Sequence, residues 1–254
     1  MFINGRLHLA YQTLLVARPS HFYRFYSRMA AEGERVVHKD EMRQFMVNCM
    51  TKVGTSEAHA VQLADVLLEG DIRGHYSHGL NRLGMYVQDV KLNICKGDGE
   101  PKILKERAGT AWVDGNNVLG PVVGNFCMDL AIKKAKEAGI GWVVAKGSNH
   151  YGIAGWYTLR AMKQGMLGMS MTNTSPFEYP TRSAKPALGT NPISVAAPGE
   201  NGDAFVLDMA STTVAIGKVR FSFGRSHLID CTSTNNKCAM EIRANEQQPS
   251  KSQD

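Results

Sequence analysis

The segment Lys146–Gly152 constrains the fold more than any other, because it stands between a strand pattern and a helix pattern. Residues 140–145 are apolar and partly β-branched, which predicts a short buried strand. Residues 155–164 carry apolar side chains three or four positions apart, which predicts a helix. The glycine-bounded turn between them holds His150, an imidazole that exchanges protons near neutral pH. A histidine placed there fits acid–base chemistry and equally fits a hydrogen bond that stabilises the turn.

Composition limits the class of protein. The 254 residues, 43% of them apolar, can bury one large core or two modest ones. No stretch approaches the roughly 18 consecutive apolar residues of a membrane span, so no membrane partner is expected. The five cysteines form no Cys-x-x-Cys pair and are odd in number, which argues against a zinc knuckle or a disulfide scaffold and favours a reducing compartment. The net charge of +6 comes without a long basic run, so nucleic acid is not expected as a partner.

The first 33 residues are a candidate mitochondrial transit peptide or an ordinary basic leader. Residues 1–31 contain Arg6, Arg18, Arg24 and Arg28 but no acidic residue, and apolar side chains lie between the arginines. Both interpretations stay open, and the expected location is accordingly cytoplasmic or mitochondrial.

Helix and strand patterns occur in two groups, which predicts an α/β protein with an N-terminal helical domain over residues 34–104. Helices in that domain are expected over residues 40–54, 55–68 and 80–93. A second domain is expected over residues 105–220, where one further helix is expected over residues 126–138 and strands are expected near residues 103–114, 167–171, 191–196 and 204–208. Residues 221–254 are polar and aperiodic, which is typical of a frayed tail.

The polar segment Asp71–Gly79 allows a metal site as one alternative. His75 and His78 stand three residues apart, an acceptable spacing for metal ligands on a helix, and Asp71 would be the third ligand. No second cluster completes the shell, so no metal is expected, and capping or surface polarity accounts for Asp71 and His75.

A second interpretation is the oxidation of a 2-hydroxy acid. That reaction needs a fixed donor set for the carboxylate, best supplied by a guanidinium, and a neutral imidazole that takes the hydroxyl proton. Arg82 suits the first task and a histidine the second, while Asp208 could hold an imidazole in one tautomer. The residues joined in this interpretation are Ser77, His78, Arg82, His150, Thr190 and Asp208. The chain has no Gly-x-Gly-x-x-Gly, so a standard Rossmann site is unsupported.

Five strings in the right order resemble the malate/L-lactate dehydrogenase family, which includes ureidoglycolate, sulfolactate and piperideine-2-carboxylate enzymes. They are Asp71–Gly79 with Arg82, Gly147–Gly152, Thr172–Pro176, Leu188–Pro192 and Leu207–Ser211. The resemblance covers about residues 38 to 219. It implies hydride transfer between NAD or NADP and a small 2-hydroxy or 2-oxo acid, a nucleotide-binding sheet that is not a Rossmann domain, and a homodimer for a complete member.

The resemblance also implies roles for individual residues. By motif, His150 matches the proton acceptor, and His78 with Ser77 and Asp208 matches a second polar group beside the nicotinamide; which histidine is the base stays open. The implied roles are catalytic for His150, His78 and Asp208, substrate-binding for Ser77, Arg82 and Thr190, and cofactor-binding for Thr174, Asp208, Met209 and Ala210.

The sequence departs from the family pattern near its end. Family members continue well past the position of Lys218 through a glycine-rich segment with a Gly-Tyr-Lys-Gly string, and nothing after Val219 resembles it. The expectation is therefore a truncated chain with a partial NAD(P)-binding domain that is a poor enzyme. The alternative from a different class is a catalytically inactive ligand-binding or interaction protein of the same fold. Neither the particular 2-hydroxy acid nor the choice between NAD and NADP follows from the residues.

Overall fold

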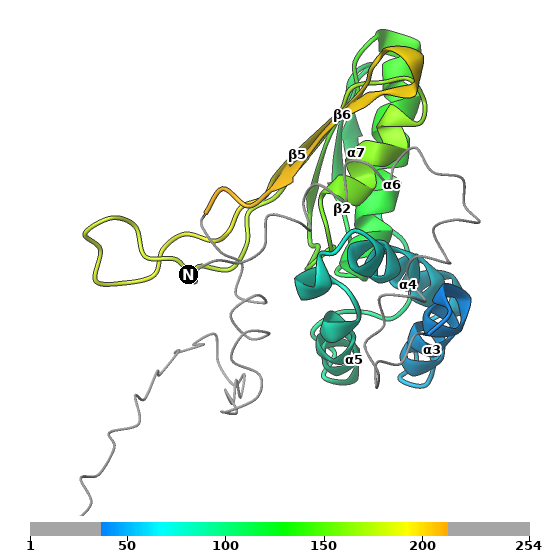
Figure 1. Ribbon diagram of the computed structural model, residues 1–254, viewed down its shortest axis with the longest axis vertical. Coiled ribbons are helices and arrows are strands. Elements are labelled where there is room, and N and C mark those ends of the chain that lie inside the picture. The colour runs from blue at the N-terminus through cyan, green and yellow to red at the C-terminus, as the bar shows by residue number, and fades with distance from the viewer. Residues whose placement is uncertain (1–36, 213–254) are drawn as a thin grey trace, which may run out of the picture.

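The computed structural model describes residues 37–212, and the candidate leader and the polar tail lie outside this range (Figure 1). The helices are α3 (Lys39–Thr51), α4 (Glu57–Ile72), α5 (Leu83–Lys91), α6 (Gly120–Ala138) and α7 (Gly155–Met162), and the short 3-10 helices are η1 (Tyr76–His78), η2 (Leu80–Arg82) and η3 (Glu200–Gly202). The strands are β1 (Lys102–Glu106), β2 (Thr110–Asp114), β3 (Trp142–Lys146), β4 (Gly168–Met171), β5 (Ile193–Pro198) and β6 (Ala204–Met209). This mixture of helices and strands is an α/β fold, as the sequence predicts.

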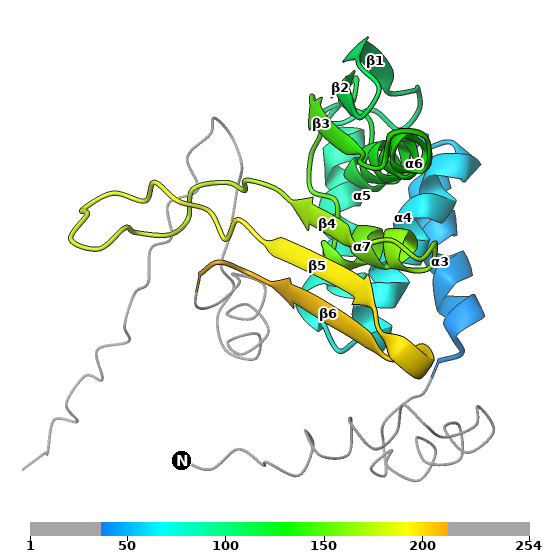
Figure 2. The ribbon, with the colours of Figure 1, turned by 90° about the horizontal axis from the view of Figure 1, so that it is seen from above.

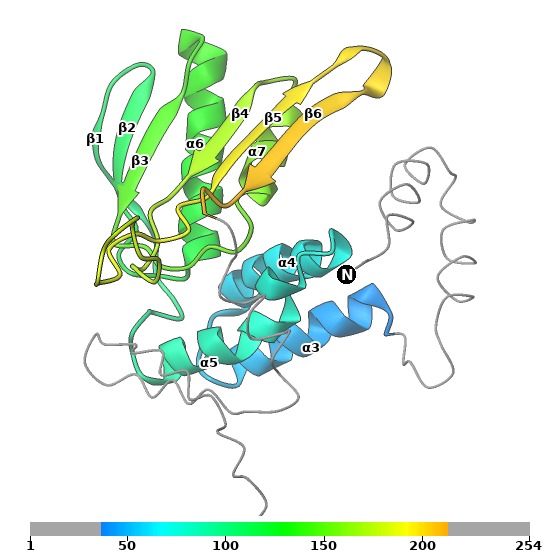
Figure 3. The ribbon, with the colours of Figure 1, turned by 60° about the vertical axis from the view of Figure 1, so that its left-hand side comes forward.

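The helices α3, α4 and α5 form one packed group below the strands in the view of Figure 3. Their buried faces carry Met46, Met50, Leu63, Leu67 and Tyr86, all at most 1% exposed. The first turn of α6 contributes Val122 and Val123 to the same core, together with the preceding Val118 and Leu119. The helical group and the strand-bearing part of the chain therefore share one core at the start of α6.

The described strands form two three-stranded sheets, seen as separate groups in Figures 2 and 3. In the first sheet β1 pairs antiparallel with β2, and β2 pairs parallel with β3. A parallel pair needs a crossover connection, and α6 is that connection. In the second sheet β4, β5 and β6 pair antiparallel in that order, and α7 packs against β4 and β5.

Most predicted elements are confirmed with shifted ends, although β3, which was expected to be a buried strand, is largely exposed. The stretch 103–114 is a hairpin of two strands. The third helix starts at Leu83, because residues 76–82 form two 3-10 turns first. The fourth helix starts at Gly120, not at Phe126. Pro121 suits a first helical turn, since its missing N–H would have no partner there in any case.

No helix within residues 37–212 is both long enough and apolar enough to cross a membrane.

Candidate active site

The loop between β3 and α7 holds His150 in a fixed position. Gly147 and Gly152 have φ values of 63° and 81°, which side-chain-bearing residues adopt at a cost. The Asn149 side chain ties the loop to the start of α6, because its Oδ1 accepts from the Gly120 amide at 2.7 Å and its Nδ2 donates to the Val118 carbonyl at 2.9 Å. A Cβ at Gly120 would collide with the carbonyl oxygens of Asn149 and His150, so only glycine allows this approach.

The imidazole of His150 points toward Tyr86 of α5. The Tyr86 hydroxyl lies 2.6 Å from His150 Nδ1, and the Gly152 amide donates to the same nitrogen at 3.3 Å. Burial lowers the pKa of His150 to about 3, and the positive charges available on His78 and Arg82 act in the same direction. His150 is therefore a neutral imidazole across the physiological pH range.

His78, Ser77 and Arg82 lie beside His150. The rings of His78 and His150 stack with their centroids 5.5 Å apart and their planes 21° apart. His78 Nδ1 lies 2.8 Å from the Ser77 hydroxyl, and Arg82 Nε donates to the Ser77 carbonyl at 2.8 Å. Two short 3-10 helices from the helical group thus meet the β3–α7 loop, and four of the predicted site residues come together.

A second group of predicted site residues gathers where β4 and β6 end. The hydroxyls of Thr174 and Thr190 are 3.3 Å apart. Ser211 donates its amide to the Thr190 carbonyl at 2.9 Å, which brings the end of β6, with Met209 and Ala210, next to this loop. Within residues 37–212 no hydrogen bond joins this group to the two histidines.

Asp208 of β6 lies against the start of α7. Its Oδ2 accepts from the Gly155 amide at 2.7 Å, at the N-terminus of α7, where the first amides have no partner within the helix. Burial raises the pKa of Asp208, while the Gly155 hydrogen bond and the nearby His75 and Arg73 oppose that rise. The side chain that hydrogen-bonds the His150 ring is Tyr86, while the hydrogen bond of Asp208 goes to the Gly155 amide.

Asp71 has a structural partner as well. Its Oδ2 accepts from the Leu80 amide at 2.8 Å, and it fills the space that a Cβ at Gly79 would need. Burial raises the pKa of this carboxyl. The side chain thus bridges α4 and the turn that carries His78.

Two residues of the site were missed in the sequence. Tyr86 lies within the helix predicted over residues 80–93 without any assigned role, and Asn149 appears only as part of the motif string Gly147–Gly152. The position of Asn149 in a glycine-bounded turn could have indicated its role, because asparagine side chains in turns commonly form hydrogen bonds with backbone groups. No local signal marked the Tyr86 hydroxyl, since its partner lies 64 residues away.

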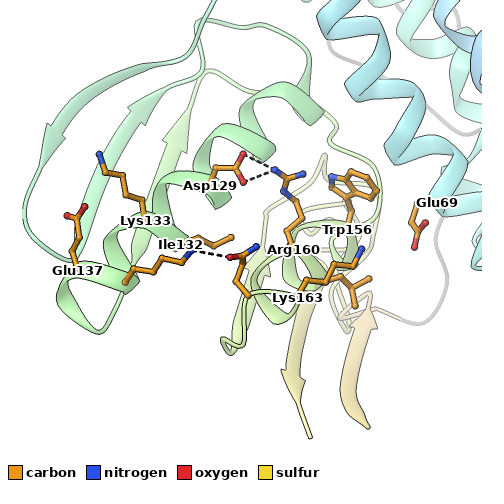
Figure 4. Close-up of a pocket in the computed structure, with 11 residues that line it drawn as sticks. Glu69, Asp129, Ile132, Lys133, Glu137, Trp156, Arg160 and Lys163 are labelled. Atoms are coloured by element: carbon orange, nitrogen blue, oxygen red, sulfur yellow. Dashed lines mark hydrogen bonds and ion pairs between the residues drawn. The ribbon is translucent and has the colours of Figure 1, made fainter. Parts of the chain in front are cut away.

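A pocket of about 660 Å³ lies apart from this site, between α6, α7 and Glu69 of α4 (Figure 4). Trp156, Ile132 and Leu159 line it, with charged residues of both signs around them. The Asp129–Arg160 ion pair, with N–O distances of 2.6 and 2.8 Å, occupies part of its wall. It contains none of the predicted site residues.

Comparisons with known proteins agree with the motif strings. The sequence model of the malate/L-lactate dehydrogenase family matches residues 37–226. A malate dehydrogenase of Pyrococcus horikoshii is 46% identical over 183 residues, which cover 72% of this chain and 51% of that protein. An NAD(+)-dependent ureidoglycolate dehydrogenase of Escherichia coli K12 is 33% identical over 187 residues, covering 72% and 52%. The crystal structure of a malate dehydrogenase from Entamoeba histolytica superposes with a TM-score of 0.72 at 33% identity, covering 78% of this chain and 55% of that one.

The chain therefore belongs to the malate/L-lactate dehydrogenase family. It spans about half the length of the curated relatives that it matches.

Proposed function

We propose that this protein is an oxidoreductase that transfers a hydride between NAD or NADP and a small 2-hydroxy acid of the malate or lactate type. The observation that carries the proposal is the meeting of a neutral imidazole, His150, with His78 and Arg82 in one site. Relatives named for malate, sulfolactate and ureidoglycolate support the substrate class.

Each site residue has a task in this reaction. The guanidinium of Arg82 suits a planar carboxylate, because its paired N–H groups match the two oxygens. Thr190 is a second proposed contact of that carboxylate, and the Ser77 hydroxyl holds the His78 ring. His150 and His78 are the two candidates for the group that exchanges the hydroxyl proton.

The cofactor-binding positions are proposed at the ends of β4 and β6. Hydroxyl groups such as that of Thr174 suit the oxygen-rich parts of a nucleotide, and a Cβ at Gly189 would collide with Thr174, so the backbone passes closely there. Met209, half of whose surface is exposed, and Ala210 continue this edge, and Asp208 precedes them in β6. Bound NAD or NADP would supply the hydride acceptor. The β3–α7 turn lacks a Rossmann fingerprint, which supports a nucleotide-binding sheet of another kind.

We also propose that the chain is divided into two domains. Residues 34–104 would form the helical domain that presents Ser77, His78 and Arg82, and residues 105–220 would contribute to the cofactor domain. A homodimer is the proposed assembly, and the proposed location is cytoplasmic or mitochondrial.

The test is turnover of a panel of 2-oxo acids with NADH and NADPH, using the wild-type chain and His150→Ala. His150→Ala should lose most of the rate while circular dichroism shows an unchanged fold. His38→Ala is the matched control, because His38 is exposed at the start of α3. Wild-type turnover in His150→Ala would remove His150 from the mechanism and leave His78 as the base. Calorimetric titration with NADH separates a competent enzyme from the inactive alternative, because the enzyme must bind the cofactor.

A further inference from the structure

Tyr86 contacts the imidazole of His150 from inside the core. Its side chain is 1% exposed and belongs to the core of the helical group, yet its hydroxyl reaches out of α5 to the β3–α7 loop. Burial raises the pKa of Tyr86 above its ordinary value, so the hydroxyl keeps its proton at neutral pH. A protonated phenol therefore stands against one nitrogen of the ring.

Three distances decide where the protons lie. The Gly152 amide is 3.3 Å from His150 Nδ1, and a backbone N–H can only donate. Nδ1 must then offer its lone pair, so the Tyr86 hydroxyl also donates to it, at 2.6 Å. The hydroxyl has a second acceptor, the His150 carbonyl, but at 3.3 Å this contact is the weaker of the two. A neutral imidazole carries one proton, which must therefore be on Nε2.

Nε2 is the nitrogen that remains for substrate. Within residues 37–212 the hydrogen bonds of the His150 ring all involve Nδ1. His78 stacks on the face of the ring, and Arg82 contributes positive charge nearby. The edge of the imidazole that carries Nε2 is thus turned away from Tyr86 and Gly152.

We propose that Tyr86 is a positioning residue that fixes the Nε2–H tautomer of His150, so that this N–H donates a hydrogen bond to the reacting oxygen of the substrate. The inference rests on the proposed function. During reduction of a 2-oxo acid, NADH or NADPH would give a hydride to the carbonyl carbon, negative charge would develop on the carbonyl oxygen, and His78, the other candidate group, would supply the proton that completes the hydroxyl. A fixed N–H aimed at that oxygen stabilises the charge more in the transition state than in the ground state.

The test is ¹⁵N NMR of the histidine rings, because Nδ1 and Nε2 have different shifts when protonated and unprotonated. The His150 signals are assigned by their absence in His150→Gln. In the wild-type chain at pH 7, Nε2 should be protonated and Nδ1 unprotonated. Tyr86→Phe keeps the ring but removes the stronger of the two donors to Nδ1, so that only the longer Gly152 contact of 3.3 Å opposes the Nδ1–H tautomer, which should then become populated beside the Nε2–H tautomer. The turnover number for 2-oxo acid reduction should fall by about 10- to 100-fold, the usual effect of removing such a supporting contact, with KM changed less than about twofold.

Tyr157→Phe is the matched control. Tyr157 is also 1% exposed, and its hydroxyl makes one bond of 2.6 Å to the Tyr151 carbonyl, without touching the imidazole. It should leave the His150 spectrum unchanged. A wild-type spectrum with the proton on Nδ1 would overturn the proposal, even if Tyr86→Phe failed to fold. So would a Tyr86→Phe chain with the wild-type tautomer and rate. If no 2-oxo acid is reduced, the proposed function fails while the spectrum still tests the role of Tyr86.

Discussion

Acidification from pH 7 to about pH 5.5 is expected to destabilise the fold through His150. Burial lowers the pKa of this imidazole from 6.5 to about 3 in the folded chain, with His78 and Arg82 adding to the effect. The unfolded chain exposes the ring, which then binds a proton near its ordinary pKa. Between pH 6.5 and about 3 the unfolded state therefore binds more protons than the folded state, and stability is lost as the pH falls.

The size of the loss follows from proton linkage. One proton bound only in the unfolded state costs 1.36 kcal/mol per pH unit well below the unfolded pKa, so the step from pH 7 to 5.5 costs about 1.2 kcal/mol. This is an upper value, since the ring keeps some contact with solvent. Buried carboxyls such as Asp71, Asp89 and Asp208, whose pKa values are raised, also titrate on acidification, but they contribute equally to any variant that leaves them in place.

Urea unfolding of the wild-type chain and of His150→Gln at both pH values measures this contribution. The free energy of unfolding of His150→Gln should fall less than that of the wild type, by about 1.2 kcal/mol at most. His38→Gln serves as the control, because that side chain is exposed. Equal losses in the wild type and His150→Gln would show that His150 is not held neutral in the folded chain.

Three further outcomes are expected. Arg82→Lys should weaken substrate use by about 2–3 kcal/mol while NADH affinity, measured by titration, changes little, since an ammonium cannot grip both carboxylate oxygens; an equal loss of NADH affinity would make Arg82 a nucleotide or structural contact. Gly120→Ala should cost about 1–3 kcal/mol in urea unfolding and reduce turnover, because its Cβ meets the His150 carbonyl; wild-type stability would contradict that close approach. Asp208→Ala should lower the free energy of unfolding by about 1 kcal/mol through the lost Gly155 contact, with Asp208→Asn losing less; identical losses in both would argue against the hydrogen bond.

Local patterns predicted the elements better than their ends. The sequence placed the start of the fourth helix at Phe126, because Gly120, Pro121 and Gly124 look like a loop. In the fold these glycines let the helix approach other groups. A Cβ at Gly124 would collide with the Tyr157 ring, just as one at Gly120 would meet the His150 loop. Such approaches depend on tertiary packing, which periodicity does not contain.

The candidate site also contains features that the sequence predicts and features that depend on tertiary packing. The motif strings predicted that His150, His78 and Arg82 work together, and the fold brings them together. Asp208 was a candidate partner for an imidazole, and in the fold the pairing of β6 with β5 places it against the Gly155 amide, a contact that local patterns do not reveal. Helical spacing predicted the helix that carries the buried Tyr86, but apolar periodicity does not show which distant group a buried hydroxyl will hydrogen-bond.

The Asn149 side chain couples the loop that carries His150 to the start of α6, so the two are expected to open together. Both of its hydrogen bonds end on backbone groups at the start of that helix, and the first turn of α6 is buried in the core shared with the helical group. The loop cannot swing away without uncovering a buried amide and a buried carbonyl, each of which costs about 1–3 kcal/mol when left unpaired. The Gly120 amide proton should therefore exchange with solvent only when this part of the core opens, which makes it a native reporter of loop opening.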